Sequence, residues 1–253
     1  MALKIIGIEA PRMSLEASEG YIDSLCAGIL EEHEHDMVVL PEKWVSEIIS
    51  AREHEKLISR FAEISSSYGS TIIPGSFAVE TSTDSRQNIA TVIQRGKVLG
   101  HQAKISLFMK EAKELTSGKS VETFRADGVT LAVAVCYDLD FPYFTKVAAE
   151  RGASLIINPS LIPQQFHDMW HIYVTARALE NRVAVLSLNS SSSEFSGNSM
   201  AAVPYMHEWG VRLSITRPEN NIVSVSPDME AISAMTERRI KEDPGRYSLG
   251  FKE

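Results

Sequence analysis

The chain has 253 residues, 44% of them hydrophobic and 23% charged, which is the composition of an ordinary globular protein with enough residues for a sizeable core. The formal net charge of −8 disfavours binding to nucleic acid, because an acidic surface repels phosphate groups. No apolar run approaches the roughly 20 residues that a membrane-spanning helix needs, and the N-terminal segment MALKIIGIEA is typical of a strand rather than of a secretion signal. We therefore expect a cytoplasmic protein that has neither nucleic-acid nor membrane partners.

The first half of the chain alternates between segments typical of strands and segments typical of helices. Short runs of β-branched residues predict strands, and apolar residues that recur every three or four positions predict helices. In chain order we expect a strand at 3–8, a helix around 22–30, a strand at 37–40 that Pro41 ends, a helix around 57–64, a strand at 71–77, and a hairpin at 88–104 with its turn at 95–97.

The second half continues this alternation and indicates the class of fold. In chain order we expect a strand at 129–135, a helix at 142–152, a strand at 154–160, a helix at 168–181, a strand at 183–189, and two or three further strands. Strands that are apolar on both faces need cover on both faces, so the helices should lie outside packed sheets. No repeat or linker interrupts the pattern, and we predict one α/β domain, a layered sandwich, over residues 1–253.

The two cysteines, Cys26 and Cys136, lie in different settings. They form no CxxC pair, and two cysteines in a chain of this length do not make a disulfide framework, so we expect free thiols. Cys26 falls on the apolar face of a predicted helix, where a small buried hydrophobe is the simplest interpretation. Cys136 ends a buried strand, and ligands of open α/β sheets bind beyond the carboxyl ends of the strands. A nucleophilic cysteine also needs a base and a group that stabilises the oxyanion, which other strand ends must supply.

Two charged residues follow other predicted strands in the same way. Glu42 comes directly after the strand that Pro41 ends, and Lys104 closes the second strand of the hairpin. Each alone would be interpreted as a solvated loop charge, because most Glu and Lys side chains are exposed. Together with Cys136 they supply a carboxylate, an ammonium group and a thiol at three strand ends, which is a set that could attack a carbonyl group.

These three positions carry a resemblance to a known family. The segments VVLPE with Glu42, AKISLF with Lys104 and VCYDLDFP with Cys136 resemble, in this order, the signatures of the nitrilase superfamily of carbon–nitrogen hydrolases. The segment EAKELTSG resembles the family segment that contains a second glutamate, here Glu111. The segments INPS, ARALENRV and FSGNS are similar to later family segments, so the resemblance covers nearly the whole chain.

The resemblance implies a four-layer αββα sandwich and a Glu42–Lys104–Cys136 triad, with Glu111 holding Lys104 or orienting the substrate nitrogen. In such a site Glu42 takes the proton of the thiol as Cys136 attacks an amide carbonyl, because a free thiol with a pKa of about 8.5 is mostly protonated at neutral pH. Lys104 and the backbone N–H of Tyr137 stabilise the oxyanion. Ammonia or an amine leaves, and water activated by Glu42 hydrolyses the thioester without a cofactor. The family also implies a homodimer or a higher homo-oligomer.

The chain departs from the family's pattern after the cysteine, and this bears on the substrate. Many relatives that act on carboxylate-bearing substrates have an arginine shortly after CYD, whereas this chain has Leu139 and Asp140. Arginine would bind a carboxylate through two hydrogen bonds and Asp140 would repel it, so one expectation is a neutral or amine-bearing amide. The alternative is that Asp140 points away and forms a local salt bridge or helix cap. Trp44, close after Glu42, is expected either to wall the substrate pocket or to be ordinary core.

Three alternatives to amide hydrolysis remain open. The scaffold also hosts hydrolysis of N-carbamoyl amines or amino acids, and acyl transfer in which an amine replaces water at the thioester. The segment HDMWH places His167 and His171 at i and i+4 of a predicted helix, where both could bind one metal ion with Asp168 as the base. This metal-dependent hydrolase is the weakest alternative, because aspartate is one methylene shorter than the usual glutamate and the spacing indicates no third ligand. We therefore expect a small amide as the substrate and no metal site.

Overall fold

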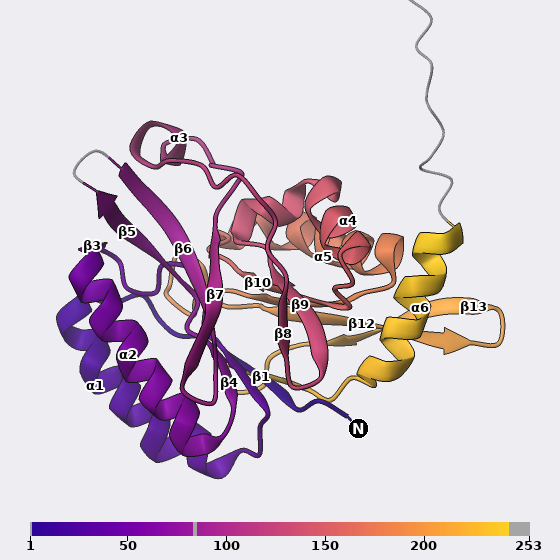
Figure 1. Ribbon diagram of the computed structural model, residues 1–253, viewed down its shortest axis with the longest axis horizontal. Coiled ribbons are helices and arrows are strands. Elements are labelled where there is room, and N and C mark those ends of the chain that lie inside the picture. Colours follow the sequence, from indigo (N-terminus) through magenta and orange to yellow (C-terminus); the bar gives the residue numbers. More distant parts are fainter. Residues whose placement is uncertain (1, 83–84, 243–253) are drawn as a thin grey trace, which may run out of the picture.

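The structure, a computed structural model, describes residues 2–82 and 85–242. Two β-sheets pack face to face, and helices cover their outer faces, so that the chain forms four layers in the order α, β, β, α (Figure 1). No helix in these two ranges is both long and apolar enough to cross a membrane.

The larger sheet is built mainly from the N-terminal half and has eight strands within the described residues. Its strands are β1 (Ile5–Ile8), β2 (Met37–Val39), β3 (Ile48–Ser50), β4 (Thr71–Ile73), β5 (Ser76–Ser82), β6 (Ser85–Gln94), β7 (Lys97–Ala103) and β14 (Ile222–Val225). They lie in the order β14-β1-β2-β4-β6-β5-β3, and β7 also pairs with β6. Because β1, β2 and β4 are parallel, their carboxyl ends meet at one edge of the sheet.

The smaller sheet follows in the chain and has six strands within the same described residues. Its strands are β8 (Phe124–Ala126), β9 (Val129–Val133), β10 (Leu155–Pro159), β11 (Ala184–Leu188), β12 (Met200–His207) and β13 (Gly210–Thr216). They lie in the order β13-β12-β11-β10-β9-β8. The central strands β9, β10 and β11 are parallel, so their carboxyl ends also share an edge.

The helices divide between the two outer faces. They are α1 (Leu15–Leu25), α2 (Ala51–Tyr68), α3 (Glu111–Glu114), α4 (Pro142–Glu150), α5 (His167–Asn181) and α6 (Met229–Glu242), with a π-helical turn at Cys26–Leu30 and 3-10 turns at Cys136–Asp140 and Gln164–Phe166. Helices α1 and α2 cover the larger sheet, α4 and α5 cover the smaller one, and α6 packs beside α4 and α5 (Figure 1).

Helix α2 shows how the local sequence fixes an element. Ser50 and Glu53 form a capping box, in which each side chain accepts a hydrogen bond from the backbone N–H of the other residue. Leu57 and Phe61 are among the apolar residues that recur at helical spacing and are buried against the sheet. The helix ends at Gly69, whose φ of 64° is a left-handed conformation that glycine adopts without strain.

Alternation along β1 places the core on both sides of the larger sheet. Ile6 and Ile8 pack among the residues of α1 and α2, whereas Ile5 packs in the cluster that includes the smaller sheet. Gly7 points toward the smaller sheet, and a methyl group there would lie 2.9 Å from a Leu188 side-chain carbon. A glycine is therefore required where the two sheets approach most closely at this strand.

The αββα sandwich expected from the resemblance is confirmed. A few elements differ from those predicted from the sequence. The predicted strand 71–77 is two strands, because Pro74 and Gly75 interrupt it and Gly75 has a φ of 80°. The C-terminal strands are present, but the sequence reading missed helix α6, although its apolar residues Met229, Ile232 and Met235 recur every three positions and are buried. Of the single domain expected over residues 1–253, residues 1, 83–84 and 243–253 lie outside the described residues.

Candidate active site

Glu42, Lys104 and Cys136 each lie just beyond the carboxyl end of a strand. Glu42 follows β2, Lys104 follows β7 directly, and Cys136 follows β9. The first two strands belong to the larger sheet and the third to the smaller sheet, so the two sheets present these side chains to each other. Glu42 and Lys104 are 1% exposed and Cys136 is 8% exposed. The three groups therefore meet in a site that is almost closed to solvent.

The Glu42 carboxylate is the centre of this cluster. Its Oε1 accepts hydrogen bonds from the Lys104 ammonium at 2.9 Å and from the side-chain amide of Asn88 at 2.7 Å. The Cys136 thiol lies close enough to the same carboxylate for Glu42 to raise the pKa of the thiol. One carboxylate thus contacts the ammonium group and lies near the sulfur whose proton a base must remove.

Glu111 forms a second bridge between charged groups. Its Oε2 accepts a hydrogen bond from Lys104 at 2.7 Å, and its Oε1 accepts one from Lys43 at 2.6 Å. Burial alone would raise the pKa of Glu111, but the charges of Lys104 and Lys43 outweigh burial and lower it. Glu111 is therefore an ionised carboxylate that holds two ammonium groups, of which only Lys104 also contacts Glu42.

The electrostatics of the cluster keep the lysine charged and the thiol neutral. Burial alone would lower the pKa of Lys104, but the negative charges around it, above all that of Glu42, raise it. Burial raises the pKa of the Cys136 thiol, Glu42 raises it further, and Lys104 opposes both. At neutral pH the sulfur is therefore protonated, so an attack by this sulfur requires that the proton move to a neighbouring base.

The backbone at Cys136 adopts a conformation that is rare for a residue with a side chain. Its φ is 45°, in the left-handed region, which typically costs about 1–3 kcal/mol and persists only where the surroundings enforce it. Asn158 on β10 enforces it, because its Nδ2 donates to the carbonyls of Ala134 at 2.6 Å and of Cys136 at 3.2 Å. The side-chain oxygen of Asn158 accepts in turn from Ser160 and Ser187, so every polar atom of the amide has a partner.

Asp138 connects the turn that carries Cys136 to the loop that carries Lys104. Its carboxylate accepts hydrogen bonds from the backbone N–H groups of Val135 at 3.2 Å, Ile105 at 3.1 Å and Ser106 at 2.6 Å. Burial raises the pKa of Asp138 to about 6, although these N–H groups favour the charged form. This carboxylate therefore fixes the distance between two segments of the site.

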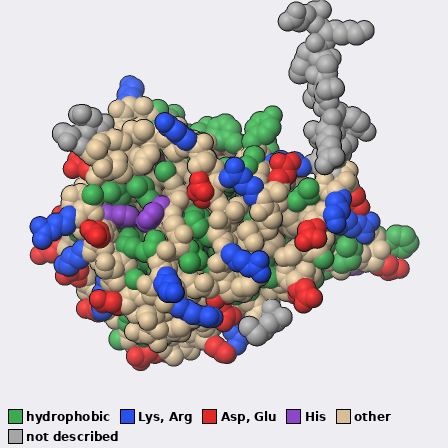
Figure 2. All heavy atoms as spheres, in the orientation of Figure 1, with side chains coloured by type: hydrophobic (Ala, Val, Ile, Leu, Met, Phe, Trp, Pro, Cys, Tyr) green, Lys and Arg blue, Asp and Glu red, His purple; other side chains and the backbone are tan. Residues whose placement is uncertain are grey.

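Tyr137 lies in an aromatic cluster that reaches the surface beside the site. Its ring contacts the rings of Phe108 and Phe141 edge to face, with centroid distances of 4.9 Å and 5.1 Å. Phe108 and Phe141 are 47% and 41% exposed. Hydrophobic side chains also gather at the surface above α4 (Figure 2). The backbone N–H of Tyr137 belongs to the first turn of the 3-10 segment, where N–H groups have no acceptor within the helix.

The other two residues expected to contact substrate have structural partners. The Asp140 carboxylate lies near the Tyr173 hydroxyl and raises the pKa of that hydroxyl. Trp44 is fully buried, donates a hydrogen bond to the carbonyl of Pro74 at 2.7 Å, and packs with Phe61 among the residues beneath α1 and α2. Neither a salt bridge nor a helix cap is formed by the Asp140 side chain within the described residues, so its role stays a prediction, and Trp44 lies in the outer core.

The histidine pair considered as metal ligands is held by protein groups. His167 is buried, its Nδ1 accepts from Asn198 at 3.0 Å, and its Nε2 lies 3.2 Å from the carbonyl of Ile162. His171 lies against the guanidinium of Arg217, whose Nη1 is 2.7 Å from Nε2. Among residues 2–82 and 85–242, no group of three or more His, Cys, Asp or Glu side chains could hold a metal ion. The metal-dependent alternative therefore lacks a ligand set in this part of the chain.

Several polar residues that shape the site were not predicted from the sequence. Lys43 and Asp138 lie next to residues that were singled out, inside the same motifs, and that proximity was the available signal. Asn88 and Asn158 are polar residues inside apolar strands and are fully buried. A buried amide needs hydrogen-bond partners, so an asparagine in such a strand indicates a polar neighbour that the sequence alone does not identify.

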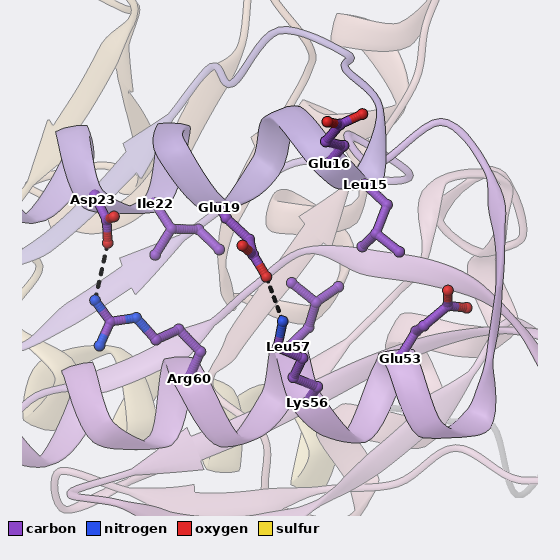
Figure 3. A pocket seen from close by; sticks show the side chains of 9 residues that line it. All are labelled: Leu15, Glu16, Glu19, Ile22, Asp23, Glu53, Lys56, Leu57 and Arg60. Carbon is purple, nitrogen blue, oxygen red and sulfur yellow. Dashed lines mark hydrogen bonds and ion pairs between the residues drawn. The ribbon is translucent and has the colours of Figure 1, made fainter.

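A surface groove between two helices lies away from this cluster. It has a volume of 610 Å³, runs between α1 and α2, and is crossed by ion pairs from Lys56 to Glu19 and from Arg60 to Asp23 (Figure 3). None of the residues that line it belongs to the Glu42–Lys104–Cys136 cluster. These surface ion pairs are exposed to solvent, and the groove is a seam between two helices of one layer.

The chain belongs to the carbon–nitrogen hydrolase family, whose sequence profile matches residues 6–224. It is an amidase-type hydrolase of the nitrilase superfamily, as its relatives and structural neighbours indicate. The resemblance inferred from the three sequence signatures is thereby confirmed.

Among the relatives, 2-oxoglutaramate amidase from Bacillus subtilis is 25% identical over 240 residues, which cover 90% of this chain and 89% of the relative. Among solved structures, Nit3 from Saccharomyces cerevisiae, a member of the nitrilase superfamily, has a TM-score of 0.82 at 20% identity, and the match covers 97% of each chain. A variant amidase from Nesterenkonia sp. has a TM-score of 0.74 at 20% identity, over 94% of this chain and 95% of that one. In that structure the acetamide moiety of fluoroacetamide is bound covalently to the active-site cysteine.

Proposed function

We propose that this protein hydrolyses the amide bond of a small linear amide through a thioester on Cys136, with Glu42 as general base and acid and Lys104 as the oxyanion-stabilising cation. The observation that carries the proposal is the convergence of these three groups: Glu42 Oε1 lies 2.9 Å from the Lys104 ammonium, and the Cys136 thiol lies near enough to both for Glu42 to raise its pKa and Lys104 to lower it. The covalent adduct on the cysteine of the Nesterenkonia amidase supports it by analogy.

In the first half-reaction the thiol proton moves to Glu42 as the sulfur attacks the carbonyl carbon of the amide. The carbonyl π electrons move onto oxygen, which becomes an oxyanion. Lys104 and the backbone N–H of Tyr137 stabilise that charge, and donors fixed in a dry site act more strongly than donors in water. When the tetrahedral intermediate collapses, Glu42 returns the proton to the leaving nitrogen, and the carbon–nitrogen bond breaks to leave a thioester and ammonia.

In the second half-reaction Glu42 removes a proton from water, which attacks the thioester carbonyl. The thiolate leaves, takes the proton back from Glu42, and the carboxylic acid product departs. Glu111 supports both halves by holding Lys104, since its Oε2 accepts a hydrogen bond from that ammonium at 2.7 Å. A variant in which Glu111 is replaced therefore affects the reaction through Lys104, which makes Glu111 a positioning residue.

For the substrate we propose a neutral small primary amide. Both ammonium groups beside the site, those of Lys43 and Lys104, are already paired with Glu111. The chain has Leu139 and Asp140 where an arginine would bind a substrate carboxylate. The preference rests on the paired lysines rather than on repulsion by Asp140, whose carboxylate lies near the Tyr173 hydroxyl and raises its pKa. The contrary outcome is a preference for a carboxylate-bearing amide. The name of the Bacillus subtilis relative, 2-oxoglutaramate amidase, indicates such a substrate for that protein.

The experiment compares ammonia release from propionamide and from the monoamide of glutaric acid. We expect a higher kcat/KM for propionamide, and we expect that Cys136→Ala abolishes turnover of both substrates while Cys26→Ala leaves it unchanged. Turnover that survives in Cys136→Ala would overturn the cysteine mechanism. A clear preference for the glutaric monoamide would overturn the substrate assignment alone. An acyl group found on an added amine rather than in a free acid would indicate acyl transfer.

We also propose that the chain forms a homodimer through the outer face of α5. Met169, Ile172 and Leu179 lie along one side of this helix and are 47%, 66% and 37% exposed. Exposed apolar side chains on one side of a helix are typical of protein–protein contacts. Sedimentation analysis of the wild type and of Ile172→Glu should show a dimer and a monomer, and a wild-type monomer at micromolar concentration would contradict the assignment.

A further inference from the structure

Asn88 contacts both charged residues of the proposed site, and one atom of its side-chain amide has no protein partner. Its Nδ2 donates to Glu42 Oε1 at 2.7 Å, and its backbone carbonyl accepts from the Lys104 N–H at 2.8 Å. Because a carboxylate oxygen only accepts, the amide nitrogen is the atom bonded to Glu42, and Oδ1 is left as an acceptor. Within residues 2–82 and 85–242 this buried Oδ1 has no hydrogen-bond partner.

Ser76 carries a second buried polar atom of the same kind. Its Oγ also has no hydrogen-bond partner among the described residues, and Ser76 and Asn88 are both 0% exposed. A polar atom that is buried without a partner lowers stability, and in native proteins such atoms are usually bonded to the chain or to an ordered water molecule. The two atoms therefore indicate a small polar partner from outside the chain.

Strand pairing places the two residues together beside Glu42. Ser76 pairs with Ala90 on β6 in the same register in which Ala78 pairs with Asn88, so Ser76 and Asn88 are diagonal neighbours on one face of the sheet. On its other side Ser76 forms a parallel bridge with Glu42. Ser76 therefore lies between Glu42 and β6, and the hydrogen bond from Asn88 to Glu42 joins the two neighbours on either side of it.

The shared face is the one that looks toward the smaller sheet. Ile89 packs among the residues beneath α1 and α2, whereas Ala90 packs in the cluster that contains Cys136. Side chains alternate along a strand, so Asn88 points to the same side as Ala90, and Ser76 does so with it. Both unpaired atoms thus lie on the side of the sheet where the thioester would form.

A water molecule satisfies this set of groups in an orientation that suits hydrolysis. Water can donate two hydrogen bonds and accept two, and buried water molecules typically make about three. Here it would donate to Asn88 Oδ1 and to Glu42, accept from the Ser76 hydroxyl, and keep one lone pair for attack. Because Glu42 Oε1 already accepts from Lys104 and Asn88, Oε2 is the oxygen that remains to take the proton.

We propose that Ser76 and Asn88 form a binding site for the hydrolytic water beside Glu42, and that this site orients the water that attacks the thioester on Cys136. The inference rests on the proposed function. In this step Glu42 takes one proton of the water, the water oxygen bonds to the carbonyl carbon, the carbon–sulfur bond breaks, and the sulfur takes the proton from Glu42. Ser76 contacts only the water, so it acts in the second half-reaction and not in the first.

The test compares Ser76→Ala with the wild type. Quenched-flow samples taken during turnover of propionamide are read by intact mass, which gives the rate constants for formation and decay of the propionyl adduct on Cys136. We expect decay to be about tenfold slower in Ser76→Ala, the usual effect of losing one hydrogen bond, and formation to be nearly unchanged. The substitution removes a hydroxyl that has no protein partner, so we expect the variant to fold.

The matched control is Ser70→Ala. Ser70 is 1% exposed and its Oγ also lacks a partner among the described residues. It comes directly before β4 (Thr71–Ile73), whereas Glu42 lies beyond the carboxyl end of the parallel neighbour β2, so the two residues are at opposite ends of the sheet. We expect Ser70→Ala to leave both rate constants unchanged.

Unchanged decay in Ser76→Ala would overturn the inference. Equal slowing of formation and decay would also overturn it, because Ser76 would then act on the substrate or on the fold. A crystal structure of the protein without substrate gives a second test that does not depend on turnover. We expect an ordered water within hydrogen-bond distance of Ser76 Oγ and Asn88 Oδ1, and no water between them at high resolution would contradict the site.

The proposed function fails on different evidence. Amide hydrolysis that persists in Cys136→Ala would remove the thioester, whereas the crystal structure would still decide whether Ser76 and Asn88 bind water. The two failures can therefore be told apart.

Discussion

Replacing Lys104 by methionine removes the ammonium group that two carboxylates share. Lys104 pairs with Glu42 at 2.9 Å and with Glu111 at 2.7 Å, and the exposed fractions of the three side chains are 1%, 2% and 14%. Water cannot replace the ammonium at such depth, so Lys104→Met leaves two negative charges buried without their common partner. Removing one member of a buried ion pair typically costs about 3–5 kcal/mol, which for a chain of this size corresponds to a fall in Tm of about 6–20 °C.

The same substitution also removes one of the donors that stabilise the oxyanion. Loss of one such donor typically lowers kcat by about 10²–10³. It also removes the positive charge that opposes the high pKa of the Cys136 thiol, so the pKa of the thiol rises further. We therefore expect Lys104→Met to lower kcat/KM by at least a factor of about 10².

Lys43→Met is the matched control, because Lys43 binds the same carboxylate, Glu111, at 2.6 Å. Its side chain is 23% exposed, and no contact to Glu42 is made by its ammonium group within the described residues. We expect a change in Tm of only a few degrees and a loss of activity below about tenfold, since one partly exposed ion pair is worth about 0–1 kcal/mol. Calorimetry and steady-state kinetics on both variants provide the comparison. Equal losses in the two variants, or near-normal activity of folded Lys104→Met, would refute the role assigned to Lys104.

Two further predictions concern residues next to the site, Gly75 and Asp138. Gly75→Ala should prevent folding or reduce stability by more than about 3 kcal/mol, because a methyl group would lie 1.9 Å from the Pro41 carbonyl oxygen beside Glu42. The control Gly69→Ala, with no atom within 4 Å of the added methyl group, should cost only about 1 kcal/mol. Comparable denaturation midpoints of the two variants would contradict this difference. Burial raises the pKa of Asp138 from 3.8 to about 6, so the folded state binds the proton more tightly and this contribution to stability is lost as pH rises from 4 to 6. Relative to Asp138→Asn, the wild type should lose about 2 kcal/mol of unfolding free energy across that range, and parallel curves in urea titrations would contradict it.

Periodicity and strand ends made much of the fold and the centre of the site predictable. The strands that precede Glu42, Lys104 and Cys136 are short apolar runs with clear ends, and those ends determine where the following polar side chain lies. The grouping of three distant positions into one site came from the ordered signatures, because strand order and sheet packing are not encoded in local periodicity. In the structure Lys104 and Glu42 are hydrogen-bonded, and the Cys136 thiol lies near enough to both for each to shift its pKa.

The supporting residues could not be predicted in the same way. From the sequence alone, a tryptophan after Glu42 could face either side of a sheet. In the structure the turn at Lys43, with a φ of 39°, directs Trp44 toward α2. Ser76 lies beside Glu42 because strands from separate parts of the chain pair with one another, and strand order follows from tertiary packing. Asp140 lies near Tyr173 on α5, an arrangement that depends on how this helix packs on the sheet.

The most direct test of the central claim is intact-mass and peptide analysis of the protein quenched during turnover of a small amide, with Glu42→Gln used to slow hydrolysis of the thioester. The account predicts a mass increase equal to one acyl group on the peptide that contains Cys136, and none on the peptide that contains Cys26. Ammonia release with no adduct on Cys136, at a rate unchanged in Cys136→Ala, would contradict it.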